Sequence, residues 1–456
     1  MANIRLMLLV GALAAPLRAE PNIAITIYAN NQALVQDSRD IDFKGGRQRI
    51  EFKNVSAQIR PETATLSATD MSIIEQNFDY DLLSPGKMMQ KAVGHVVTIV
   101  RTIPGTGAET REQAEVLSVN DGVVLKIGNR IEVLRDDGMP VRVIFDKIPD
   151  NLRAEPTLSV TVDAKAGTRP ATLRYLTPGL GWRADYVALF DENTSSIDVQ
   201  GWVTLTNNSG TTYTNADTML VAGNPQILGQ YNGGGNEGDD TLQQAGTESG
   251  TRARLGDYYL YPLGERTTIA NQQTKQVSFL DVHNAPAQHG YEFRLGWMQS
   301  MDNPQSASTV YSFSNSAKGG LGDQLPAGVV RFYIRDKQGA PQFIGEHAIG
   351  HTPMGSTLSI STGDAFDVKV KSTVDSRTRV GGHFDYNWRT TMSYHFTNAL
   401  PKPVTVHLIQ DGLWGDTMIE SESLASHRRS ADSAEWDVPV PANGKADVTA
   451  TFDSKY

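Results

Sequence analysis

The chain contains no cysteine among its 456 residues. This absence excludes disulfide bonds, thiolate zinc sites and a cysteine nucleophile. It also excludes anchoring of the protein to a membrane through a lipidated cysteine. We therefore expect apolar burial and strand pairing alone to stabilise the fold.

Long apolar runs and an excess of positive charge are also missing. Beyond the first residues, no segment approaches the roughly 20 apolar residues that a membrane-spanning helix needs, so no transmembrane anchor is expected. The formal net charge is −10, from 41 Lys and Arg against 51 Asp and Glu. An acidic balance spread along the chain favours solubility and argues against nucleic acid as a partner.

The first 19 residues have the composition of an export signal. Arg5 supplies a positive charge, residues 6–15 form a short apolar block, and small-residue cleavage patterns lie in and after this block. The alternative is that the block is a buried strand or helix of the mature fold. We predict a signal peptide over residues 1–19. Its removal takes away Arg5 and Arg18 and no acidic residue, which leaves a net charge of −12.

The chain has the alternating pattern of β-strands and little helical periodicity. In residues 197–206, side chains that suit a buried face fall at every second position, which is the period of a half-buried strand. Ser84 and Pro85 predict one helical turn, and residues 417–426 are a second short candidate. We predict a mostly β fold of several antiparallel β-sandwich or barrel modules, including an immunoglobulin-like C-terminal sandwich, with little helix.

Turn residues and shifts in composition divide the chain into modules. The predicted ranges are 1–19 for the signal peptide, 20–78 for an N-terminal β-sandwich, 79–165 for a small barrel-like β module, 166–355 for a central β-sandwich region, and 356–456 for the immunoglobulin-like sandwich. Residues 229–251 are glycine-rich, acidic and poor in aliphatics, so they are predicted to form a mobile loop. Gly-Gly at 45–46, Asp-Gly at 121–122 and Gly-Asn at 128–129 predict hairpins.

Three separated parts of the chain carry a combined likeness to one protein family. They are residues 176–182 with 201–207, Gly210, Tyr213 and 221–223; residues 325–355 with 363–367; and Asn398 with 403–406 and 438–444. On these residues the chain resembles the bacterial family called domain of unknown function 4139, across well over half of its length. The resemblance implies an exported β-rich bacterial protein of unknown activity, periplasmic or secreted, with no catalytic residues to carry over.

His347 and His351 are the best-spaced pair of metal-ligand residues. On a helix, a spacing of four would place both imidazoles on one face, where they could bind zinc. Here Gly350 and Pro353 interrupt the segment, and Ala348 stands where a zinc protease has its glutamate. On a strand, residues four apart lie about 13 Å from each other, too far to share one metal easily. The alternative is a polar strand-to-loop junction, so both histidines are kept as candidate ligand-binding residues without a metal.

Trp202 is the third candidate ligand-binding residue. Gln200 and Thr204 share its face of the strand, so the indole is predicted to stand among polar side chains. The tryptophans, with the tyrosines at 258, 259 and 261, could build a stacking platform for a carbohydrate. The alternative is core and interface packing, because large aromatics bury the most area per residue.

Other combinations are weaker. His383, His395 and His407 recur at equal spacing, and the last two are predicted to face solvent or a neighbouring domain. The acidic stretch around Gly238 shows no register of oxygen ligands of the kind that calcium needs, and the G-x-S-x-G motif of a serine hydrolase is missing. No catalytic residue, metal ligand or cofactor is therefore predicted.

Three functions stay open at this point. The first is a non-enzymatic binding or interaction protein of the cell envelope, whose partner is another envelope protein or a glycan. The second is an envelope hydrolase with a site assembled from distant loops, which sequence spacing cannot reveal. The third is a structural assembly subunit that uses exposed strand edges. The lack of a catalytic set favours the first, and the oligomeric state is left open.

Overall fold

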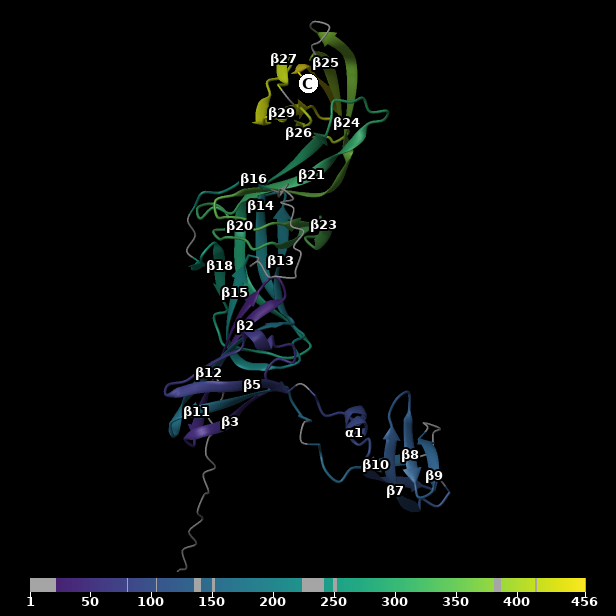
Figure 1. The fold of residues 1–456 in the computed structure, drawn as a ribbon. Helices are drawn as coiled ribbons and strands as arrows, with labels where there is room; N and C mark the ends of the chain where they lie inside the picture. The colour runs from purple at the N-terminus through teal and green to yellow at the C-terminus, as the bar shows by residue number, and fades with distance from the viewer. Residues whose placement is uncertain are drawn as a thin grey trace, which may run out of the picture. The chain divides into compact units, whose positions relative to one another are not determined.

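The computed structural model describes residues 22–79, 81–103, 105–134, 141–149, 152–223, 242–248, 252–380, 387–414 and 416–455. The predicted signal peptide lies outside these residues, and so does most of the predicted mobile loop 229–251. The described residues form thirty strands, one α-helix and one short 3-10 helix, η1 (Pro61–Thr63). The prediction of a mostly β fold with little helix is confirmed (Figure 1).

The α-helix, α1 (Pro85–Lys91), begins where the sequence predicts a helical turn. The Ser84 hydroxyl accepts a hydrogen bond from the Lys87 backbone N–H at 3.2 Å, and Pro85 occupies the first turn. Within the described residues, no helix has the length and apolar character that a membrane crossing requires.

The chain separates into two compact units. Unit 1 comprises Met1–Gly181, Thr206–Leu220 and Pro262–Gln273, and unit 2 comprises Trp182–Leu205, Val221–Tyr261 and Thr274–Tyr456. The predicted central range 166–355 is therefore divided between the units. The reason is that its first strand pairs back onto the N-terminal strands instead of joining the strands that follow it.

Unit 1 contains two sheets outside its small module. The larger has the order β15-β1-β2-β12-β4 with β19 beside β15, and the smaller has the order β3-β11-β5. The bounds are β1 (Asn22–Tyr28), β2 (Gln32–Phe43), β3 (Gly46–Lys53), β4 (Thr65–Ser67), β5 (Met71–Asp79), β11 (Thr157–Ala164), β12 (Gly167–Pro178), β15 (Tyr213–Ala222) and β19 (Thr267–Ile269).

A bent two-stranded ribbon joins these two sheets. β2 pairs with β12 as far as Phe43 and Gly167, and β3 pairs with β11 from Gly46 and Ala164 onward. Gly45 and Gly46 have φ values of +87° and +70°, which glycine adopts without steric strain. The sequence predicts a hairpin at these glycines. That prediction is wrong because the turn carries the chain from one sheet into the other, so β2 and β3 never pair.

The small module is inserted between β5 and β11, which pair with each other. The structure assigns residues 157–164 to β11, so the module ends earlier than the predicted boundary at 165. Its strand order is β10-β6-β7-β8-β9. The bounds are β6 (Val96–Thr102), β7 (Glu109–Ser118), β8 (Val123–Ile127), β9 (Arg130–Leu134) and β10 (Val141–Ile144).

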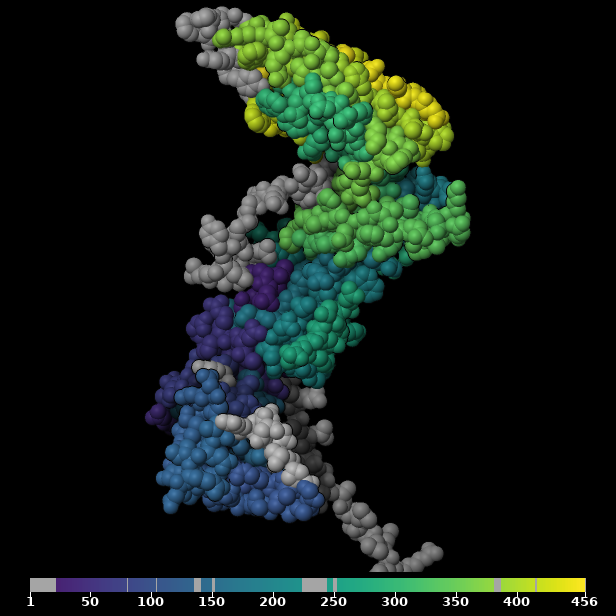
Figure 2. Space-filling model, turned by 90° about the vertical axis from the view of Figure 1, so that its right-hand side faces the viewer, coloured from purple at the N-terminus to yellow at the C-terminus, as the bar shows by residue number. Residues whose placement is uncertain are grey.

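One apolar cluster holds the small module together. Side chains from all five of its strands and from α1 contribute to this cluster, so the sheet curls around a single core. The predicted hairpins at 121–122 and 128–129 are confirmed, because β7 pairs with β8 and β8 with β9. Figure 2 shows the module, in blue, as a closely packed block.

Unit 2 is built on one extended sheet with the order β23-β22-β13-β14-β20-β21-β24-β25-β30-β27. Four further strands join this sheet outside that order. β16 pairs with β24, β26 pairs with both β20 and β29, and β28 pairs with β29. The bounds are β13 (Leu180–Asp191), β14 (Ser196–Asn207), β16 (Leu242–Gln244), β20 (Gln273–Leu295), β21 (Gln305–Ser314), β22 (Gly328–Arg335), β23 (Pro341–Ile349), β24 (Thr357–Val380), β25 (Asn387–Asn398), β26 (Val404–Gln410), β27 (Met418–Glu422), β28 (His427–Ser430), β29 (Ser433–Val440) and β30 (Gly444–Lys455). Two short strands outside this sheet, β17 (Arg254–Leu255) and β18 (Tyr258–Pro262), pair with each other.

The C-terminal part of unit 2 has its own buried core. Trp436 and Phe452, both fully buried, lie in it with side chains of β24, β25 and β26. Phe293 and Ala307 belong to the same core, so β20 and β21 extend this module beyond its predicted range of 356–456. The predicted helix at 417–426 is wrong. Ile419 packs against the core from β27, which pairs with β30.

Candidate functional site

The three candidate residues from the sequence lie on different elements. Trp202 is half-buried on β14. His347 lies on β23 opposite Val330 of β22, and His351 follows that strand. In the described structure, no hydrogen bond or ring contact joins any two of the three. They therefore do not form one site.

His351 lines a small aromatic pocket of about 200 Å³. Tyr258, Tyr259 and Tyr261, which the sequence singled out as a stacking platform, line the same pocket. The His351 Nδ1 accepts a hydrogen bond from the Ala327 backbone N–H at 3.2 Å. Burial lowers the pKa of His351, so its ring is neutral at pH 7 with the proton on Nε2.

Gly223 forms the wall of this pocket. Its φ is +126°, and a Cβ at this position would stand 2.1 Å from the ring of Tyr258. Only glycine therefore lets the chain pass so close to the tyrosine. The pocket is smaller than the usual 300–1,000 Å³ of small-molecule sites, so it suits a single ring or side chain.

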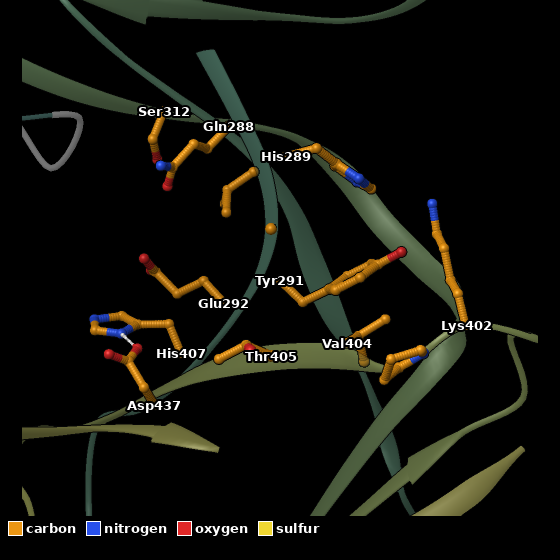
Figure 3. A pocket seen from close by; sticks show the side chains of 13 residues that line it. Gln288, His289, Tyr291, Glu292, Ser312, Lys402, Val404, Thr405, His407 and Asp437 are labelled. Atoms are coloured by element: carbon orange, nitrogen blue, oxygen red, sulfur yellow. Dashed lines mark hydrogen bonds and ion pairs between the residues drawn. The ribbon is translucent and has the colours of Figure 1, made fainter. Parts of the chain in front are cut away.

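A larger cavity of about 630 Å³ opens on unit 2, and we call it the strand-junction groove (Figure 3). It lies where the pairings of β20 with β21 and with β26 overlap. Residues lining it are Gln288, His289, Gly290, Tyr291, Glu292, Val310, Ser312, Lys402, Pro403, Val404, Thr405, His407 and Asp437. These come from β20, β21, β26 and β29 and from the turn before β26.

The groove follows from the length of β20, which has 23 residues. Residues 287–292 of this strand pair antiparallel with β21, and residues 291–295 pair in parallel with β26. Tyr291 and Glu292 pair with both strands at once, so β21 and β26 lie on opposite edges of β20, and each covers only part of its length. Gly290 widens the floor, since a Cβ there would meet only the Val310 side chain, at 3.7 Å.

One end of the groove holds an imidazole among carboxylates. The His407 Nδ1 lies 2.8 Å from Asp437 Oδ1, and its Nε2 lies 3.2 Å from Glu435 Oε2. Glu292 stands opposite His407 in the register of β20 and β26. Figure 3 shows the side chains of Glu292, His407 and Asp437 close together at this end. They offer several hydrogen-bond acceptors in one place.

The other end of the groove is aromatic. The His289 ring stacks on Tyr311 with centroids 5.1 Å apart, and Tyr291 meets its edge at 5.2 Å. Burial lowers the pKa of His289, so this imidazole is neutral and behaves as an aromatic wall. A hydrogen bond to Glu192 raises the pKa of Lys402, and that ion pair balances the positive charge at the rim.

Among the residues described, the one serine that lines the groove is not paired with a histidine. The Ser312 hydroxyl donates to the Ser359 hydroxyl at 3.1 Å, so it is engaged away from His407. Across the described ranges, no group of three or more His, Asp or Glu side chains could hold a metal ion. The groove therefore presents hydrogen-bonding groups, carboxylates among them, beside an aromatic wall.

The sequence missed most of this groove. It did name His407, as one of three equally spaced histidines expected to face solvent or a neighbouring domain. His395 pairs instead with Asp447 outside the groove, at 2.7 Å, and His383 lies outside the described residues. The spacing of these histidines carries no signal for the groove, because cross-strand partners, not intervals along the chain, decide which of them enter it.

Comparison with protein families and curated proteins identified no related protein: no family model matches this chain, and no curated protein matches it either. The likeness to the domain of unknown function 4139 family therefore stays a prediction made from the quoted residues.

Proposed function

We propose that this protein is a non-enzymatic binding protein of the bacterial cell envelope, and that the strand-junction groove is its binding site for a glycan. The observation that carries the proposal is the pairing of hydrogen-bonding side chains with an aromatic wall in one open groove. Ligand sites combine apolar or aromatic walls with a few placed polar groups. The groove on unit 2 has this composition.

The chemistry of the lining fits a sugar better than an apolar ligand. Sugar hydroxyls both donate and accept, and the groove supplies carboxylate acceptors at Glu292 and Asp437 and a mixed amide at Gln288. The aromatic side of Tyr291 can cover the apolar face of a sugar ring. At the rim, the ion pair of Lys402 with Glu192 leaves little unbalanced charge to select an anion.

A hydrolase acting in the same groove is the second candidate. The carboxylates around His407 favour it, because carboxylate pairs cleave glycosidic bonds in many enzymes. The same binding experiment separates the two, since a hydrolase would shorten the bound oligosaccharide over time. We also propose that the C-terminal module is an immunoglobulin-like sandwich, which its buried Trp436 between paired strands supports.

Removing one groove carboxylate is expected to weaken glycan binding at least about tenfold. Asp437→Asn and Glu292→Gln each keep the side-chain size and lose a charged acceptor, and a hydrogen bond to a charged group contributes about 1.5–3 kcal/mol. The measurement is titration calorimetry of the purified mature chain with a panel of neutral and amino-sugar oligosaccharides.

Asp447→Asn is the matched control for Asp437→Asn. Both aspartates bond a histidine in unit 2, and their side chains are 66% and 67% exposed. The control should bind the oligosaccharide as the parent chain does. The groove is not a glycan site if Asp437→Asn and Asp447→Asn lose the same affinity for the oligosaccharide, or if the parent chain binds no oligosaccharide of the panel.

Export is expected to depend on residues 1–19. The full chain, expressed in a bacterium, should appear in the periplasmic fraction and begin after residue 14 or 19 when its N-terminus is sequenced. Deletion of residues 1–19 should leave the protein in the cytoplasm. A full chain that stays cytoplasmic with residues 1–19 intact would contradict the envelope part of the proposal.

A further inference from the structure

Exposed apolar side chains concentrate in the small module. Nine of the 17 large apolar side chains exposed in the described structure lie within residues 83–148. Single exposed apolar residues are ordinary, whereas a local concentration of them is typical of an interaction surface. The most exposed of the nine is Ile131 on β9, at 71%, and Val133 on the same strand is 50% exposed.

β9 lies at the end of the strand order of its sheet and pairs only with β8 among the described strands. Ile127 and Arg130 flank the two-residue turn at Gly128, whose φ is +59°. Residues that flank such a turn form a hydrogen-bonded pair, and pairs alternate along the ladder. The backbone N–H and C=O groups of Ile131 and Val133 therefore point away from β8, toward the free edge.

We propose that this protein self-associates through β9, with the β9 strands of two copies pairing antiparallel about a two-fold axis at Ile131. In this register Ile131 faces Ile131 of the second copy, and the two residues exchange both of their backbone hydrogen bonds. The pairing joins two five-stranded sheets and covers the most exposed isoleucine of the module.

The charges on β9 select this register. With the axis at Ile131, Arg130 of each copy stands opposite Glu132 of the other, in the closer type of antiparallel pair. A register shifted to place the axis at Glu132 would instead oppose two carboxylates, which destabilises the pairing. Within one copy, Arg130 already contacts Glu112 at 2.7 Å, and its side chain stays 57% exposed. Arg130 also contacts Glu132 of its own copy at 3.5 Å, and Arg101 contacts the same carboxylate, so a bond to the second copy adds to these existing ion pairs on the exposed side of the guanidinium.

The association is expected to be weak, because two five-residue strands bury less than a standard interface. Sedimentation of the mature chain should show a concentration-dependent dimer. Ile131→Lys places two cations face to face and should weaken the dimer at least tenfold. Val96→Lys, at an exposed valine of the same module but away from β9, should leave the dimer unchanged.

A cross-linking test measures the register itself, because it traps the dimer that is present and reports which residues face each other. The chain has no cysteine, so Ile131→Cys creates a single thiol. Cross-linking with a short thiol-reactive reagent should join two copies through residue 131. Val133→Cys should react poorly, because its two thiols would be offset by about four residues, or 13 Å.

Several outcomes would overturn the proposal. A parent chain that stays monomeric up to about 1 mM excludes it, because any remaining association would have a Kd above the millimolar range. A dimer that cross-links through Glu132→Cys and not through Ile131→Cys has the other register. Assemblies larger than a dimer would mean that the contact does not close about a two-fold axis. If the chain stays monomeric and β9 instead binds a different protein, the edge of β9 serves that partner and not a second copy. None of these results depends on the groove of unit 2.

Discussion

Phe452→Ala is expected to destabilise unit 2 by about 3–5 kcal/mol, the usual loss when a buried phenylalanine is truncated. Phe452 is 0% exposed and meets the edge of the Trp436 ring at a centroid distance of 6.4 Å. Surrounding strands pair on both sides of β30, so the cavity left by the ring cannot collapse easily. Urea unfolding followed by tryptophan fluorescence measures the loss as a lower midpoint.

Phe366→Ala is the matched control for this substitution. Phe366 belongs to β24 in the same unit and is 88% exposed. Its removal should change the free energy of unfolding by no more than about 0.5 kcal/mol. If Phe366→Ala and Phe452→Ala lower the free energy of unfolding equally, the buried core of the C-terminal module is not its main source of stability.

Asp185→Asn is expected to destabilise unit 2 by about 1.5–3 kcal/mol at pH 7, the range for hydrogen bonds to a charged group. Asp185 is buried on β13, where its carboxylate accepts hydrogen bonds from Thr204 at 2.6 Å and from Arg331 at 3.0 Å. Burial by itself opposes ionisation of Asp185. The hydrogen bonds and the charges of Arg183 and Arg331 outweigh that effect and lower its pKa below the ordinary value of 3.8.

The effect of Asp185→Asn should depend on pH in one direction. A carboxyl whose pKa is lower in the folded state stabilises the fold above its unfolded pKa, and this stability disappears as the pH falls through the folded pKa. The difference between the parent chain and Asp185→Asn should therefore be full at pH 7 and shrink below about pH 4. Urea midpoints at both pH values measure it.

Asp281→Asn is the control for the buried carboxylate. The Asp281 side chain is 55% exposed and accepts a hydrogen bond from the Gln200 side chain at 3.4 Å. Its replacement should therefore change the free energy of unfolding little at either pH. A pH-independent loss in Asp185→Asn would mean that the shape of the side chain, and not its charge, matters at this position.

Local pattern was enough to place many elements. The start of α1 follows from Ser84 and Pro85, whose capping and fixed φ act within one turn. The hairpins at 121–122 and 128–129 follow from turn residues whose backbone preference is also local. The absence of cysteine excludes whole classes of site by composition alone.

The failures share one physical cause. At Gly45 and Gly46 the sequence shows a turn but not whether the flanking strands meet afterwards. Residues 417–426 have weak helical periodicity, but pairing of β27 with β30 and packing of Ile419 against the core determine a strand there. In both cases the deciding contacts come from residues distant in the chain.

By itself, the sequence determined the strand content of this protein, its thiol-free chemistry and several of its turns, because these depend on neighbouring residues. Tertiary structure alone decided that β20 pairs with both β21 and β26 and so brings Glu292, His407 and Asp437 together. It also decided that His351 lies with the tyrosines at 258, 259 and 261 around one pocket. The alternation of apolar and polar residues along a strand predicts which face of the sheet each side chain occupies. Which side chains lie beside it on that face depends on the pairing of strands that are distant in the sequence.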